Sequence, residues 1–292
     1  MRLFVGIDYY TIKIFLHQTP VNHSVIYICF VMVAFMTRIF IALLFVASGV
    51  AFAQEKSLED ESADFSPDRQ LLLYYQSFAR EEPLPDFGLF KLAVTGYFNL
   101  KDSDRIGQAD IVTIIDFRKP SNQKRLWIVD LKARSVLYHT LVAHGRNTGN
   151  LYAESFSNVP NSNTSSLGFY TTAQTYIGKH GLSLRLDGQE KGFNDKARER
   201  AIVLHGADYV SKDFVKMHGR LGRSFGCPSV PMAVHKEVIN TIKDGTCLFI
   251  FYPDKNYLSK SKLIQPTNLV AQVQKLTSEP AANTAAPPGS SR

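Results

Sequence analysis

Cys227 lies in the stretch GRLGRSFGCPSVP, which spans residues 219–231. A thiolate is a strong nucleophile, but a free thiol is mostly protonated at neutral pH. Arg220 and Arg223 lie a few residues upstream, and nearby positive charge lowers the pKa of a thiol. These residue types therefore indicate a cysteine that could attack a carbonyl carbon.

The neighbours of Cys227 restrict what its backbone can do. Gly226 permits a tight turn and lets a substrate approach without a side chain in the way. Pro228 biases Cys227 toward extended geometry and has no N–H of its own. We therefore expect an oxyanion formed here to accept hydrogen bonds from the N–H groups of Gly226 and Cys227. The hydroxyl of Ser224 is expected to hydrogen-bond within the same turn.

Two nearby histidines are candidates for the base that activates the thiol. His205 ends the apolar run RAIVLHG at residues 200–206, and a histidine at a strand end can project into a cleft. Taken alone, such a histidine is more often a structural residue. His218, in the polar segment KDFVKMHGRLGR, is the alternative base. The remaining histidines lack metal-site spacing such as H-E-x-x-H, so we expect no metal.

The N-terminal region has the pattern of an export signal. Residues 36–53 combine Arg38, an apolar run and an Ala-Phe-Ala cleavage site, which predicts a cleaved signal peptide. Residues 1–35 would then lie upstream of the true start at Met36. The alternative is a membrane anchor, since about 20 apolar residues can span a bilayer. Both interpretations place the folded part outside the cytoplasm, and signal cleavage would leave no stable membrane partner.

Removal of residues 1–53 would also remove Cys29 and leave Cys227 and Cys247. Two cysteines in an oxidising compartment indicate a disulfide, which is the main alternative to a nucleophilic role. Cys247 lies in the apolar run TCLFIFY, where a small thiol packs well in a buried strand. The cysteine count by itself leaves both interpretations open.

Residues 105–258 have the pattern of a mainly β domain with some α structure. Short runs rich in β-branched and aromatic residues recur along it, which predicts an antiparallel β-sandwich or barrel with short flanking helices. The strand candidates are residues 110–117, 125–131, 135–145, 167–178, 182–188, 200–206 and 246–253. A helix is expected over residues 234–245, where Gly245 provides a stop.

The flanking segments are expected to be less regular. Residues 54–104 are predicted as a lead-in with a short helix at 68–80 and another short element at 90–100, and residues 259–292 as a flexible tail. The formal net charge is +7, but no basic run with interleaved aromatic residues occurs. We therefore expect no nucleic-acid partner. The sequence does not define an oligomeric state.

Two motifs together resemble the murein L,D-transpeptidase catalytic domain family, which is related to YkuD-type domains. They are His205-Gly206 in RAIVLHGADYVS and Ser224-x-Gly-Cys in GRLGRSFGCPSVP, and SSLGFYTT at 165–172 is similar to a third family pattern. The resemblance implies a β-rich catalytic domain in which Cys227 is the nucleophile and His205 its base. It implies that Gly226 contributes to the oxyanion site and that Ser224 is the motif hydroxyl.

The chain departs from the wider family around the cysteine. Phe225 stands where His or Arg is usual, and Pro228-Ser229 replaces a pair that often contains an arginine. The arginine that would meet a substrate carboxylate is thus missing from its usual place. Arg220, Arg223 and Tyr209 are the expected substrate-binding residues instead.

The resemblance implies acyl transfer on peptidoglycan without a cofactor. The thiolate would attack diaminopimelate at position three of a stem peptide, release D-Ala and form a thioester, and an amine would then take the acyl group in a 3–3 crosslink. The first alternative is hydrolysis by the same residues, as an L,D-carboxypeptidase or amidase. The second is a non-catalytic wall-binding module. The expected location is the periplasm or cell wall.

Overall fold

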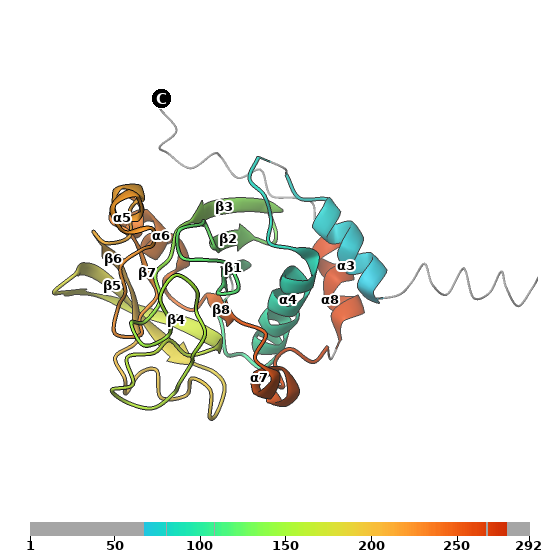
Figure 1. Ribbon diagram of the computed structural model, residues 1–292. Coiled ribbons are helices and arrows are strands. Elements are labelled where there is room, and N and C mark those ends of the chain that lie inside the picture. The colour runs from blue at the N-terminus through green and yellow to red at the C-terminus, as the bar shows by residue number, and fades with distance from the viewer. Residues whose placement is uncertain (1–66, 80, 108, 267, 279–292) are drawn as a thin grey trace, which may run out of the picture. The chain divides into compact units, whose positions relative to one another are not determined.

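The computed structural model describes residues 67–79, 81–107, 109–266 and 268–278, and Figure 1 shows how their helices and strands are arranged. The predicted signal peptide at 36–53 and the segment before it lie outside the described residues. No helix in the described part of the chain is long and apolar enough to cross a membrane.

An eight-stranded mixed sheet forms the body of the described chain, in the order β3-β2-β1-β8-β4-β5-β6-β7. The strands are β1 (Ile111–Asp116), β2 (Leu126–Asp130), β3 (Ser135–Thr140), β4 (Gly168–Gly178), β5 (Gly181–Gly188), β6 (Val203–Ala207), β7 (Ser229–Pro231) and β8 (Cys247–Phe251). Two neighbouring pairs, β1–β8 and β6–β7, are parallel, and the others are antiparallel. The sheet is therefore mixed, where the sequence predicted antiparallel pairing.

The two edges of the sheet approach each other and nearly close it into a barrel. The segment after β3 bridges to β7 and to the turn before it, through the pairs Ala143–Ser229 and Gly145–Ser224. Backbone N–H groups of Ala143 and Arg146 donate to Ser229 and Ser224 carbonyl oxygens, both at 2.8 Å. The predicted mainly β, barrel-like fold is confirmed, and its closure holds the residues around Cys227.

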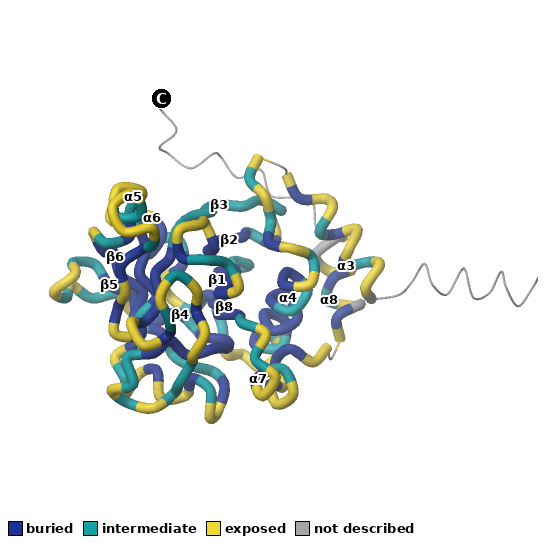
Figure 2. The backbone as a smooth tube through the Cα atoms, viewed as in Figure 1, coloured by how far each residue is buried: buried dark blue, intermediate teal, exposed yellow. Residues whose placement is uncertain are grey.

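Six helices lie within the described residues: α3 (Pro67–Gln76), α4 (Phe87–Asp102), α5 (Lys212–His218), α6 (His235–Ile242), α7 (Lys255–Lys260) and α8 (Leu269–Ser278). Helix α4 lies between the sheet and the pair α3 and α8 in Figure 1, and it contacts β1, β8 and both helices. Figure 2 shows most of α4 in the colour of buried residues. It is thus a core helix.

The predicted strands and helices are present, whereas the short elements β7, α5 and α7 were not predicted. Two further differences lie at the flanks. The element expected at 90–100 is the 16-residue helix α4, whose apolar residues belong to the same core cluster as the strands. The tail expected from residue 259 begins as ordered structure, because Ser261, Leu263 and Val273 are buried. On α8, the buried residues Leu269 and Val273 lie four positions apart, which is helical spacing. A pattern of only two such positions is too short to predict a helix in a segment of low apolar density.

Candidate active site

Ser224 shapes the turn that carries Cys227. Its hydroxyl donates to the Cys227 carbonyl oxygen at 2.7 Å and accepts from the Gly226 N–H at 3.0 Å. Its own N–H donates to the His144 carbonyl oxygen at 3.0 Å. Ser224 therefore both closes the turn and fixes it to the barrel edge, as a serine side chain can do by bonding nearby backbone.

Gly226 is required by its backbone conformation and by its surroundings. Its φ is +124°, which L side chains rarely adopt, and a Cβ there would lie 2.7 Å from the Thr164 carbonyl oxygen. Because its N–H is bonded to Ser224, only one of the two expected oxyanion donors is available. The Cys227 N–H has no acceptor among the residues that the structure describes, so it remains the candidate donor.

The Cys227 thiol is half-buried against the segment that leads into β6. Its Sγ lies 3.7 Å from the carbonyl oxygen of Ala201. Burial raises the pKa of the thiol, while a hydrogen bond from the Val203 backbone and the charges of Arg200 and Lys179 oppose the rise. The surroundings thus combine an apolar wall with two cations.

His205 is buried on β6, and its two ring nitrogens have different partners. Nδ1 lies 2.9 Å from the Gly206 carbonyl oxygen, and since a carbonyl can only accept, Nδ1 carries the proton. Nε2 therefore accepts from the Ser229 hydroxyl at 3.0 Å, and that oxygen lies 3.1 Å from the Tyr209 hydroxyl. This assigns Nε2 as the basic nitrogen.

The pKa of His205 is lowered, first by burial and then by neighbouring positive groups that include His180 and Lys179. The exposed ring of His180 stacks on the His205 ring with centroids 4.4 Å apart and 21° between the planes. A buried imidazole among cations stays neutral at neutral pH. It is thus in the form that can accept a proton.

Cys227 lies in the segment just before β7, the strand that pairs with β6, and no hydrogen bond joins it to His205 in the described part of the chain. His205 pairs with Ser229 in the register of β6 and β7, and Cys227 precedes Ser229 by two residues. In extended chain this spacing places both side chains on one face. Ser229, which the sequence did not single out, is the side chain that contacts the base.

The other predicted residues have different places. Arg220 donates to the Leu221 carbonyl oxygen, and Arg223 donates to the carbonyl oxygens of Arg146 and Gly149. Both arginines therefore hold backbone near the turn. The alternative base, His218, is exposed at the end of α5, where its ring lies 4.3 Å from that of Phe214.

Cys227 and Cys247 are both free thiols. Cys247 is fully buried in β8, as its apolar surroundings predicted. Because both thiols are free, the disulfide alternative has no support in the structure.

No group of three or more His, Cys, Asp or Glu in the described ranges is arranged to hold a metal ion.

Arg200 is the residue near Cys227 that the sequence did not identify. Its guanidinium is among the charges that lower the Cys227 pKa, and its Nη2 would lie 3.4 Å from a Cβ on Gly226. It stands 27 positions before Cys227, just ahead of the apolar run that contains His205. Nothing in that spacing distinguishes it from Arg198, whose guanidinium is exposed and bonded to Asp187.

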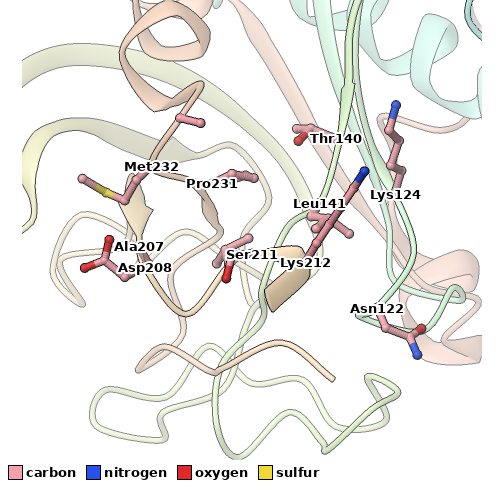
Figure 3. A pocket seen from close by; sticks show the side chains of 12 residues that line it. Asn122, Lys124, Thr140, Leu141, Ala207, Asp208, Ser211, Lys212, Pro231 and Met232 are labelled. Atoms are coloured by element: carbon pink, nitrogen blue, oxygen red, sulfur yellow. The ribbon is translucent and has the colours of Figure 1, made fainter. Parts of the chain in front are cut away.

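A pocket of about 440 Å³ lies at the ends of β6 and β7 (Figure 3). Ala207 and Pro231 line it, and they pair with each other two residues beyond His205 and Ser229. Asp208 and Met232, the residues that follow them, also line the pocket, so it lies where β6 and β7 end. Figure 3 shows Asp208 and Lys212 at this pocket, with Leu141 from the segment after β3.

Comparison with known families identifies the domain. Residues 82–251, more than half of the chain, match the family model of the L,D-transpeptidase catalytic domain (YkuD_2). The chain belongs to this family. The family resemblance drawn from the His205-Gly206 and Ser224-x-Gly-Cys motifs is thereby confirmed. No curated protein matches the chain.

Solved structures of L,D-transpeptidases are similar at low identity. One from Mycobacterium smegmatis has 11% identity and a TM-score of 0.32, covering 49% of this chain and 59% of that chain. One from Mycobacterium tuberculosis H37Rv has 10% identity and a TM-score of 0.34, covering 49% and 58%. L,D-transpeptidase 3 from Mycobacterium tuberculosis, with a faropenem-derived adduct, has 10% identity and a TM-score of 0.33, covering 49% and 61%. The chain thus spans less than two thirds of each.

Proposed function

We propose that this L,D-transpeptidase family member is a cysteine acyltransferase that acts on peptidoglycan stem peptides outside the cytoplasm. Cys227 attacks the carbonyl of the third residue, diaminopimelate, and D-Ala leaves, so that a thioester forms. An amine of a neighbouring stem then attacks the thioester and frees the thiol, which leaves a 3–3 crosslink. The observation that carries the proposal is a half-buried thiol two residues before Ser229, whose hydroxyl contacts the buried His205, within a domain of this family.

His205 moves the proton in this scheme. The Ser229 hydroxyl gives its proton to His205 Nε2 and takes the Cys227 proton, and the reverse transfer protonates the leaving D-Ala amine. The existing Ser229–Nε2 hydrogen bond of 3.0 Å supports this route. The Cys227 N–H, which has no acceptor in the described part of the chain, stabilises the oxyanion. Acylation releases the D-Ala amine and consumes the thiol, and the second step consumes the acceptor amine and regenerates the thiol.

The pocket beyond Ser229 supports a peptide-length substrate. It lies where β7 ends at Pro231, and four residues of extended chain between Cys227 and Pro231 span about 13 Å. A stem peptide bound at Cys227 is long enough to reach Asp208 and Lys212 in this pocket. Neither of these side chains has a charged partner among the described residues.

The test is mass spectrometry of the protein incubated with a peptidoglycan tetrapeptide. We expect an acyl adduct on Cys227 that Cys227→Ala does not form. His205→Ala should form it about 10²–10⁴-fold more slowly, because a positioned base contributes that much. An unchanged rate in His205→Ala with a lost rate in His218→Ala would move the base to His218. Absence of any adduct on wild-type protein with a reduced Cys227 would refute the proposal.

The acceptor is tested by analysing the products formed with a second stem peptide. New 3–3 dimers are expected if an amine takes the acyl group. Shortened stems alone would instead identify water as the acceptor and make the protein a carboxypeptidase of the same mechanism.

A further inference from the structure

Arg200 carries a charge that no carboxylate neutralises among the described residues. Its side chain donates to four neutral oxygens: the carbonyls of Ser157 and Thr164, both at 2.7 Å, the Ser162 hydroxyl at 3.2 Å, and the Ser166 hydroxyl. Its Nε is buried without a hydrogen-bond partner in this same part of the chain. Burial lowers the pKa of Arg200, with Tyr170 and Cys227 opposing the shift.

The clamped guanidinium lies beside the turn that carries Cys227. Thr164, which accepts from Nη2, is also the residue whose carbonyl lies closest to the missing Cβ of Gly226. Ser165, the next residue, donates its hydroxyl to the Gly226 carbonyl oxygen at 3.1 Å. On the other side, Ala201 directly follows Arg200 and supplies the carbonyl that contacts the Cys227 thiol. The guanidinium is thus held next to Cys227 by contacts on both sides of it.

We propose that Arg200 is the fixed cation that stabilises the Cys227 thiolate, acting as a positioning residue for the nucleophile. The inference rests on the proposed function only in taking Cys227 as the nucleophile. Many cysteine nucleophiles use a charged histidine for this purpose. Here burial and neighbouring cations lower the pKa of His205, so the imidazole is neutral and a thiolate needs another counter-charge.

The arrangement separates two tasks between two residues. Arg200 supplies permanent positive charge, since an arginine does not lose its proton at physiological pH. His205 remains free to take and return a proton. Because all four Nη hydrogens of Arg200 have protein acceptors, its charge acts on Cys227 through space and not by binding the substrate.

The test is the pH dependence of Cys227 alkylation by iodoacetamide, with the alkylated peptide identified by mass spectrometry. Removing a nearby opposite charge raises a thiol pKa by about one unit or more, so Arg200→Met should slow alkylation at neutral pH about tenfold. The midpoint of the pH profile should move to higher pH. Arg200→Lys, which keeps the charge, should move it less.

Arg198→Met is the matched control. Arg198 lies two positions before Arg200 in the sequence, but its side chain is exposed and paired with Asp187. Its alkylation profile should equal that of the wild type. Arg200→Gln keeps amide donors without charge and replaces Arg200→Met if that variant does not fold. A folded neutral variant with an unchanged midpoint would overturn the proposal and leave Arg200 a purely structural clamp. The measurement needs no peptidoglycan, so it stands apart from whether the protein transfers acyl groups.

Discussion

At the scale of single residues, the site is defined by which groups are already engaged. The Gly226 N–H, both nitrogens of His205 and all four Nη hydrogens of Arg200 have protein partners. The Cys227 N–H and thiol are less constrained. Most groups of the site therefore have structural hydrogen bonds, and Cys227 is the residue that can contact the substrate.

His180 should tune the base through its stacked ring. We expect His180→Ala to raise the pKa of His205, because the variant uncovers the buried ring and removes one of the positive groups that lower this pKa. His205 must be neutral to accept a proton, so a higher pKa shifts the acid limb of the kcat/KM profile to higher pH. The pH profile of tetrapeptide turnover measures this. An unchanged pH profile would show that His180 does not affect the pKa of His205.

The residues that could be predicted from sequence are those joined by local spacing. One turn holds Cys227, Gly226 and Ser224, which contact one another. Because they are so close in sequence, the short Ser224-x-Gly-Cys motif is enough to predict that they lie together. Arg200 could not be predicted, because its partners lie at 157–166 and its target at 226–227. The sequence favoured Arg220 and Arg223 only because they are close along the chain.

At the scale of elements, the pairing of strands determines which side chains meet, and local composition does not predict that pairing. The β-branched runs predicted every strand except the three-residue β7, because that signal is local and needs a longer run. They could not predict that β6 and β7 pair in parallel, since this depends on how the chain between them returns. Yet this parallel register puts Ser229 beside His205 and Pro231 beside Ala207, which creates the face used by the site.

Helix α4 should depend on a glycine at its contact with the sheet. A Cβ on Gly96 would overlap the ring of Phe169, which stacks on Phe249 with centroids 4.0 Å apart. We expect Gly96→Ala to lower the free energy of unfolding by about 1–3 kcal/mol, the usual cost of overpacking a core. Urea denaturation measures it.

Gly88→Ala is the control in the same helix. Gly88 is exposed, and a Cβ there would approach only Asp86 Oδ1, at 3.3 Å. Its free energy of unfolding should stay the same or rise by up to about 1 kcal/mol, because alanine favours a helix over glycine. Equal effects at the two positions would contradict close packing of α4 on β4.

At the scale of the whole molecule, a polar pair is enclosed beneath the turn of Cys227. Arg125 is fully buried and donates to the Val142 carbonyl oxygen at 2.9 and 3.0 Å and to His144 Nδ1 at 2.9 Å. His144 in turn accepts the Ser224 N–H at its carbonyl oxygen. Burial and the adjacent Arg125 charge lower the pKa of His144 to about 3. The barrel therefore requires a neutral histidine at this point.

Stability should consequently fall with acid in a way that His144 controls. The unfolded chain binds a proton on His144 below a pH of about 6.5, whereas the folded chain does not until about pH 3. Between these values the free energy of unfolding falls by up to about 1.4 kcal/mol per pH unit on account of this group. His144→Gln removes the titrating group, so its stability should fall less steeply over pH 6 to about 4. Urea denaturation at several pH values measures both slopes, and comparing the two proteins cancels the contributions of His139, His205 and the carboxylates. Equal slopes in the two proteins would mean that the buried Arg125–His144 pair is not maintained in solution. The hydrogen bond from the Ser224 N–H to the His144 carbonyl oxygen would then lose its fixed position at the barrel edge.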